Sequence, residues 1–111
     1  IAGCEREPEF EIVGSAPEFW NDEETTATVM AAFTEQFGEQ TRDFGRLSGS
    51  EDFPTIANAW GVPYFYWVVG SNSDPAAPYN HSPKFAPDLD PVLDLSTRAI
   101  IAGISPWLMR A

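Results

Sequence analysis

The sequence predicts an α/β fold, a partial three-layer sandwich in which helices cover both faces of a sheet. The first observation is a run of eight apolar and aromatic residues at 62–69, which has the length and composition of a strand. The second is that this run is apolar on both faces, as expected of a strand covered on each side. The third is that amphipathic helix patterns precede and follow it. The chain offers few other strands to pair with the run, which indicates missing partners.

One other strand is expected, close to the start of the chain. Residues 9–13 alternate polar and apolar side chains, with Phe10 and Ile12 on one face. This pattern is typical of a half-buried strand in an antiparallel sheet, and we assign it to a different sheet from residues 62–69. Residues 14–17 contain Gly and Pro and are expected to end the strand and form a short connector.

A first helix is predicted to run from Asn21 or Asp22, the N-cap, to about Phe37. Acidic side chains at 22–24 occupy its first turn, where the helix dipole favours negative charge, and Gly38 is the expected stop. The apolar residues on one face, which should pack on a sheet, are Val29, Met30, Phe33 and Phe37.

A second helix is predicted with Ser50 as its cap and Gly61 as its end. Glu51 and Asp52 would lie in its first turn, and Pro54 is tolerable because it also falls there. The expected apolar face follows the spacing i, i+3, i+4, i+7 and consists of Phe53, Ile56, Ala57 and Trp60.

Residues 70–87 form a long loop with four prolines, and loops of this length tend to be functional or disordered. A last helix should begin with Asp90 as its cap and Pro91 at its first position. Pro106 should kink or end this helix. Its predicted buried stripe is Leu93, Thr97, Ile100, Ile101, Ile104 and Leu108.

Composition excludes several classes of function. The 111 residues carry a net charge of −11 with a pI near 4.1, which argues against a nucleic-acid or anionic-membrane partner. No apolar run approaches the roughly 20 residues of a membrane span. Cys4 is the only cysteine, so no disulfide forms within the chain, which fits a cytoplasmic protein and a structural role for the thiol. Residues 1–6 lack an initiator Met and are interpreted as the end of an element whose beginning is missing.

His81 is the only histidine, and it lies in the long loop. Neutral imidazole is the commonest transition-metal ligand, but a catalytic metal normally takes three protein ligands plus a water. Therefore either His81 is incidental or its co-ligands lie outside these residues. If it binds a metal, an acceptor must orient its other ring nitrogen, and Asp74 and a loop carbonyl are both candidates.

Residues 49–53, Gly-Ser-Glu-Asp-Phe, are the second candidate site. The N–H groups at a helix start beginning at Ser50 could bind a substrate carboxylate, although the charges of Glu51 and Asp52 oppose this locally. Glu51 could also bind a metal, but capping and dipole roles are more common for an acid at this position.

The order of these segments carries more information than either one alone. Residues 49–53 at a helix start, a buried strand ending in Gly70, His-Ser-Pro-x-Phe at 81–85 and a final amphipathic helix follow one another. This arrangement resembles the carboxy-terminal end of the metal-dependent aminoacylase and carboxypeptidase-like amidohydrolases. That family includes hippurate hydrolases, auxin-conjugate hydrolases and N-acyl-amino-acid amidohydrolases. The resemblance covers nearly the whole chain.

The resemblance implies a phosphorylase/hydrolase-like zinc-peptidase catalytic domain interrupted by an α+β lid domain that often dimerises. Residues 1–17 would be the end of the lid, with its last strand, and residues 18–111 the carboxy-terminal part of the catalytic domain. His81 would be a metal ligand of a site holding two zinc, manganese or cobalt ions. Substrate-binding residues would be Gly49, Ser50 and Glu51. The other ligands and the catalytic glutamate would come from the amino-terminal part, so this chain holds no catalytic residue.

This resemblance makes the expected parent a cytoplasmic, homodimeric amidohydrolase or metallopeptidase acting on N-acyl amino acids or related small amides, and inactive as this fragment alone. The chain departs from the family at residues 85–91, where an acid followed by Glu is frequent; this bears on substrate and subfamily. Two other functions remain open. One is a non-catalytic interaction module with an aromatic surface of Tyr64, Tyr66, Trp67 and Tyr79. The other is a parent that keeps the fold and has lost its metal ligands.

Overall fold

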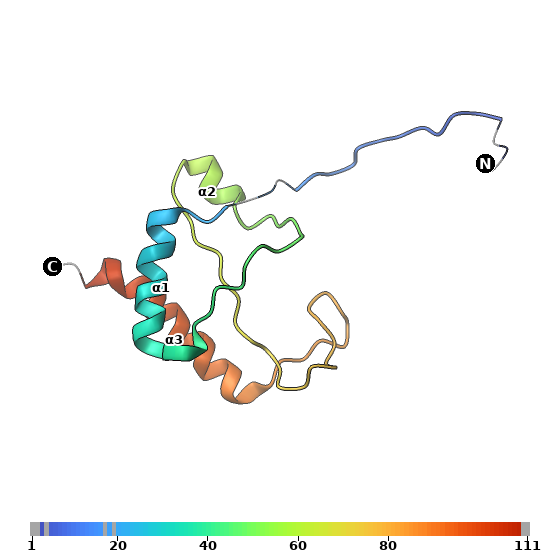
Figure 1. Cartoon of the computed structure of the whole chain (residues 1–111). Coiled ribbons are helices and arrows are strands. Elements are labelled where there is room, and N and C mark those ends of the chain that lie inside the picture. Colours follow the sequence, from blue (N-terminus) through green and yellow to red (C-terminus); the bar gives the residue numbers. More distant parts are fainter. Residues whose placement is uncertain (1–2, 4, 17, 19, 110–111) are drawn as a thin grey trace.

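A computed structural model of the chain describes residues 3, 5–16, 18 and 20–109. The elements are α1 (Glu23–Phe37), a 3-10 turn η1 (Gly38–Gln40), α2 (Thr55–Trp60) and α3 (Leu89–Leu108), as Figure 1 shows. No strand occurs among the described residues. The molecule is therefore a small helical domain, and the prediction of an α/β sandwich is wrong.

Residues 62–69, called the extended segment below, pass alongside α1 and α3 without forming a strand. Their backbone is bonded from one side by the start of α1. The Tyr66 N–H donates to Asn21 Oδ1 at 2.7 Å, and Asn21 Nδ2 donates to the Tyr66 carbonyl at 2.9 Å. The Asp22 N–H donates to the Tyr64 carbonyl at 3.1 Å. The Asn21 side chain and the Asp22 N–H thus make the hydrogen bonds to the backbone of this segment that a neighbouring strand would make in a sheet.

Side chains of this segment point alternately to two sides. The rings of Phe65 and Trp67 pack against Phe33 of α1, with centroid distances of 6.4 and 5.7 Å. Tyr64 and Tyr66 instead contact the ring of Phe53, at 5.9 and 5.0 Å. Both sides of the run are therefore apolar, as the sequence predicts, although one side packs against helices and the other contacts the ring of Phe53.

The core lies between α1 and α3. Its buried residues are Val29, Phe33, Ala99 and Ala102. Gly103 lies against the ring of Phe33, and a Cβ added there would be in van der Waals contact with Cε1 of that ring at 3.4 Å. The edge of the Phe33 ring thus fills the space above a residue without a side chain.

The predicted limits of α1 are confirmed. Asp22 is the N-cap, and its Oδ1 accepts a hydrogen bond of 2.8 Å from the Thr25 N–H. Gly38 is the C-cap with φ of 56°, and its N–H donates to the Thr34 carbonyl. Val29 and Phe33, both on the predicted apolar face, are buried.

The predicted start of α2 is wrong. This helix begins at Thr55 after Pro54, and not at Ser50. The reason is that a residue preceding proline is disfavoured in the α conformation, so Phe53 blocks extension of the helix toward its N-terminus. Gly61 ends the helix in the left-handed region, as predicted. The expected apolar face is largely in contact with solvent, and Trp60 is 76% exposed.

The predicted buried stripe of α3 is also wrong. The buried residues of this helix are Ala99, Ala102 and Gly103, whereas the large apolar residues of the predicted stripe are exposed. These small residues pack toward α1, where Gly103 lies against the Phe33 ring. Among the exposed residues, Ile101 is 59% exposed.

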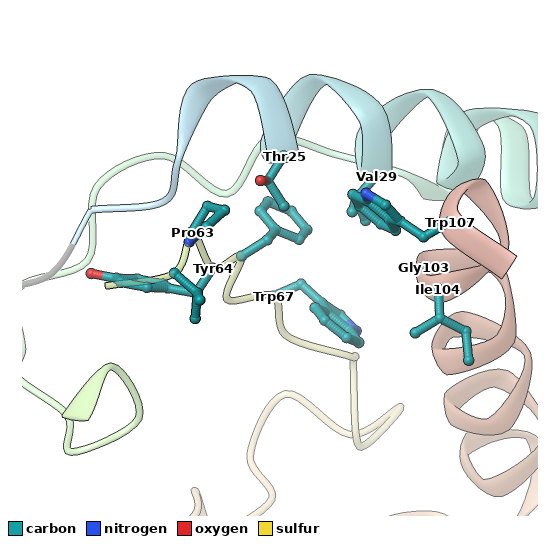
Figure 2. A pocket seen from close by; sticks show the side chains of 10 residues that line it. Thr25, Val29, Pro63, Tyr64, Trp67, Gly103, Ile104 and Trp107 are labelled. Carbon is teal, nitrogen blue, oxygen red and sulfur yellow. The ribbon is translucent and has the colours of Figure 1, made fainter. Parts of the chain in front are cut away.

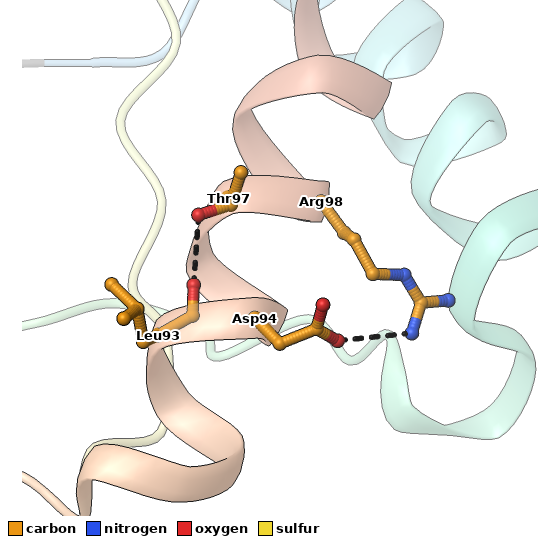
Figure 3. A network of polar contacts seen from close by, with 4 residues as sticks. All are labelled: Leu93, Asp94, Thr97 and Arg98. Carbon is orange, nitrogen blue, oxygen red and sulfur yellow. Dashed lines mark hydrogen bonds and ion pairs between the residues drawn. The ribbon is translucent and has the colours of Figure 1, made fainter.

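Polar contacts hold the first half of α3 (Figure 3). The Thr97 hydroxyl donates to the Leu93 carbonyl at 2.8 Å, and Arg98 pairs with Asp94 at 3.6 Å. The Arg98 guanidinium also lies 5.4 Å from the centre of the Phe37 ring, which connects α3 to the end of α1. Thr97 therefore belongs to a polar surface and not to the core.

Neither proline of α3 stops the helix. Asp90 has non-helical angles, φ −118° and ψ 122°, so continuous helical conformation begins at Pro91, as the sequence predicts. Pro106 cannot donate to the Ala102 carbonyl. The Ser105 hydroxyl donates to that carbonyl at 2.9 Å, and the helix continues to Leu108.

The described residues before Trp20 have no regular structure, and they extend away from the helices in Figure 1. The predicted strand at residues 9–13 is therefore wrong, and Phe10 is 90% exposed. An alternating pattern alone cannot form a strand without a hydrogen-bonded neighbour. The division of the chain at residue 17 stays a prediction, and Pro17 and Cys4 lie outside the described residues. None of the described helices is long and apolar enough to cross a membrane.

Candidate functional site

The loop that carries His81 is closed at its base by Asp88. The Asp88 N–H donates to the Ser71 carbonyl at 2.8 Å. Its Oδ2 accepts two further hydrogen bonds of 2.8 Å, one from the Ser73 N–H and one from the Ser73 hydroxyl. Beside them, Asn72 Nδ2 donates to the Ala86 carbonyl at 3.1 Å. Both arms of the loop are thus joined where it leaves the extended segment and where it enters α3.

The two hydrogen bonds from Ser73, first from its backbone N–H and then from its hydroxyl, lower the pKa of Asp88 from its usual value of 3.8. They do so because they stabilise the ionised carboxylate. Sequence reasoning did not single out Asp88 as a site residue. The available signal was the run of Ser, Asn and Asp at 71–74 directly after an apolar segment, since such side chains bond nearby backbone groups in turns.

Asp74 was a candidate partner for the His81 ring, and the structure gives its carboxylate another role. Asp74 Oδ1 accepts a hydrogen bond of 2.8 Å from the Ala76 N–H, and the Asp74 N–H donates to Asn72 Oδ1 at 2.9 Å. These are local turns within one arm of the loop. Among the described residues, no hydrogen bond joins Asp74 to His81.

His81 lies at the far end of the loop, in a tight turn. The Ser82 N–H donates to the Tyr79 carbonyl at 3.2 Å, and His81, the third residue of this turn, has φ of 70°. A positive φ at this position is the pattern of a type II turn, and histidine is several-fold enriched in this conformation compared with most residues. The imidazole is exposed and forms no hydrogen bond or ion pair with described residues. It is thus available as a single metal ligand.

The described residues contain no group of three or more His, Cys, Asp or Glu side chains that could hold a metal ion. His81 therefore supplies one ligand and no complete site within this part of the chain.

The candidate substrate-binding residues lie in an irregular segment. Gly49 and Ser50 are exposed and Glu51 is half-buried. Because α2 starts at Thr55, Ser50 is not at a helix start. The backbone N–H groups near Ser50 therefore do not form the predicted anion-binding site of a helix N-terminus. What fixes this segment is Phe53, whose ring packs on Tyr64 and Tyr66. The first motif is thus attached to the same extended segment that leads into the His81 loop.

A separate groove of about 410 Å³ lies between α1, the extended segment and the second half of α3 (Figure 2). None of its lining residues carries a charge at neutral pH, and neither His81 nor residues 49–51 line it. The residues that line it are Thr25, Val29, Val62, Pro63, Tyr64, Phe65, Trp67, Gly103, Ile104 and Trp107. The groove offers apolar contact and no acid–base chemistry.

The four aromatic residues considered as one ligand surface are divided between three places. Tyr64 and Tyr66 contact Phe53, Trp67 packs on Phe33 and also lines the groove together with Tyr64, and Tyr79 is 82% exposed in the loop. They do not form one continuous surface.

No family model matches this chain.

Proposed function

We propose that this chain is the carboxy-terminal portion of a metal-dependent amidohydrolase. It would cleave the amide bond of N-acyl amino acids or related small amides with a metal-activated water. The observation that carries the proposal is the ordered pair of motifs, Gly-Ser-Glu-Asp-Phe at 49–53 and His-Ser-Pro-x-Phe at 81–85, which resembles that family. The contact of Phe53 with Tyr64 and Tyr66, which ties the first motif to the segment preceding the second, supports it.

The chemistry assigns limited roles to this chain. A bound divalent metal, zinc or alternatively manganese or cobalt, lowers the pKa of its water to about 7 and polarises the amide carbonyl. His81 contributes one ligand from the loop tip, where its imidazole is exposed and free of hydrogen bonds to described residues. The second metal, the remaining ligands and the general base belong to the rest of the protein. Gly49, Ser50 and Glu51 border the substrate.

The remaining assignments follow the same proposal. Residues 1–17 belong to a lid domain through which the parent dimerises, and residues 18–111 belong to the catalytic part. The protein is cytoplasmic, and its net charge of −11 disfavours nucleic-acid and anionic-membrane partners.

The test uses the intact protein that contains this chain. Hydrolysis of N-acetyl and N-benzoyl amino acids is measured together with bound metal for the wild type, His81→Ala and the loop control Asn80→Ala. We expect His81→Ala to reduce kcat/KM by at least about 100-fold and to lower metal content, because a direct ligand should matter at least as much as the partners that orient one. Asn80→Ala should resemble the wild type. Unchanged activity and metal content in His81→Ala would overturn the proposal.

Two outcomes would favour the other functions. An intact protein that holds no metal and hydrolyses no amide would point to a parent that has lost its metal site. An intact protein whose amino-terminal part lacks the Cys-Gly-x-His-Asp-x-His segment of the amidohydrolase family would point to an interaction module.

A further inference from the structure

We propose that Asp88 is the positioning residue for His81: by joining the two arms of the loop at its base, its carboxylate holds the turn that presents the imidazole. This inference deepens the proposed function. Its metal-binding measurements rest on that function, whereas its measurement of loop closure by amide exchange does not.

Within the described part of the loop, Asp88 alone makes several contacts across it. Asp88 bonds Ser71 through its own N–H and Ser73 through two hydrogen bonds to Oδ2, all three at 2.8 Å. These bonds connect residues 15 or more positions apart. Hydrogen bonds to a charged acceptor are stronger than those between neutral groups.

In the part of the chain that the structure describes, the rest of the loop is bonded mostly within one arm or within the turn at His81. The Tyr79–Ser82 and Ser82–Phe85 turns, and the bond of Ser82 Oγ from the Lys84 N–H, lie within one arm and the tip. Among the described residues, the hydrogen bonds between the two arms are those of Asp88 and the Asn72–Ala86 bond. The direction in which the tip points therefore depends on the base.

His81 itself has an uncommon backbone conformation. Its φ of 70° lies in the left-handed region, which a residue with a side chain adopts less readily than the extended or right-handed regions. The Tyr79–Ser82 bond holds this turn locally, and the bonds of Asp88 hold together the two arms that carry the turn. A ligand must be held in place before the metal arrives in order to bind it tightly.

Two neighbouring acids provide matched comparisons. Asp74 lies in the loop but accepts its hydrogen bond from Ala76 in the same arm. Asp90 is two residues from Asp88, and it is exposed and makes no hydrogen bond or ion pair with described residues. Removing the charge of Asp90 therefore changes the local charge as much as removing that of Asp88, but it leaves the base of the loop closed.

The experiment uses the intact protein, with Asp88→Ala, Asp88→Asn, Ser73→Ala and the control Asp90→Asn. Amide hydrogen exchange at Ser73 and Ser82 reports closure of the loop. The dissociation constant of zinc and the absorption spectrum of the cobalt-substituted protein report the position of His81. Ser73→Ala removes one donor from an exposed side chain, so the fold is expected to persist even where Asp88→Ala perturbs it.

We expect Asp88→Ala to speed amide exchange at Ser73 by at least 10-fold, to raise the zinc dissociation constant by roughly 10- to 100-fold and to alter the cobalt spectrum. Ser73→Ala should shift both measurements in the same direction by less. In Asp88→Asn, the amide oxygen still accepts a hydrogen bond, so it should restore part of the loss. Asp90→Asn should match the wild type.

Exchange and zinc affinity that do not change in Asp88→Ala would overturn the inference, and so would an equal effect of Asp90→Asn. If His81→Ala leaves zinc affinity unchanged, the proposed function fails on its own account. Amide exchange would still decide whether Asp88 closes the loop, because that readout needs no metal.

Discussion

The side chain of Asn21 should matter more for stability than its place outside any helix suggests. It donates to the carbonyl of Tyr66 at 2.9 Å and accepts from the N–H of the same residue at 2.7 Å. These two bonds fasten the extended segment to the start of α1. Asn21→Ala removes both and leaves a partly buried N–H and C=O of Tyr66 without these partners.

The expected loss follows from the number of bonds. At about 0.5–1.5 kcal/mol for each hydrogen bond, Asn21→Ala should lower the free energy of unfolding by about 1–3 kcal/mol. This is a large fraction of the stability of a domain whose described buried core contains only four hydrophobic side chains. Asn21→Asp keeps the acceptor for the Tyr66 N–H, but it replaces the donor by a carboxylate oxygen that faces the Tyr66 carbonyl, so it should not restore the stability lost in Asn21→Ala.

The assay is urea unfolding followed by circular dichroism at 222 nm, with amide exchange at Tyr66 as a local readout. An osmolyte such as trimethylamine N-oxide can be added to all samples to move the transition into a measurable range. The control is Asn58→Ala on exposed α2, which should stay within about 0.5 kcal/mol of the wild type. If Asn21→Ala unfolds at the same urea concentration as the wild type and Tyr66 exchanges at an unchanged rate, the reasoning is refuted.

Three further predictions can be tested by the same methods. Phe33→Ala should cost about 3–5 kcal/mol because it empties the centre of the core, whereas Phe10→Ala at a 90% exposed position should be neutral in the urea assay. His81→Gly, which accepts a φ of 70° without strain, should stay within about 0.5 kcal/mol of the wild type, whereas His81→Val should cost about 1–2 kcal/mol; equal stabilities would contradict the turn geometry. The Thr25 N–H lowers the pKa of Asp22 below 3.8, so the stabilisation by this cap is present above 3.8 and is lost as pH falls through the lowered value. Below about pH 4, Asp22→Asn should therefore lose less helical signal than the wild type does. An acid transition identical to that of the wild type would contradict this role.

The candidate site was only partly predictable. His81 follows from its being the only histidine, and its place in a long loop follows from the prolines around it. The closing residue Asp88 was not predicted, because its partner Ser73 is 15 residues away. The Ser, Asn and Asp side chains at 71–74 indicate a turn, but they do not identify Asp88 as the residue that this turn contacts. Ser50 was assigned to a helix start from its neighbours alone, and the geometry imposed by Pro54 moved that start to Thr55.

The sequence by itself determined both ends of α1 and the carboxy-terminal end of α2. Asp22, Gly38 and Gly61 act on groups within a few residues of themselves, so their roles can be recognised locally. The tertiary structure alone decided which face of α3 is buried, because small residues at Ala99 and Gly103 pack where Phe33 arrives from another helix. The tertiary structure also decided that residues 62–69 and 9–13 do not form strands. A strand exists only through hydrogen bonds to residues elsewhere, and a pattern of side chains cannot specify whether those residues are present.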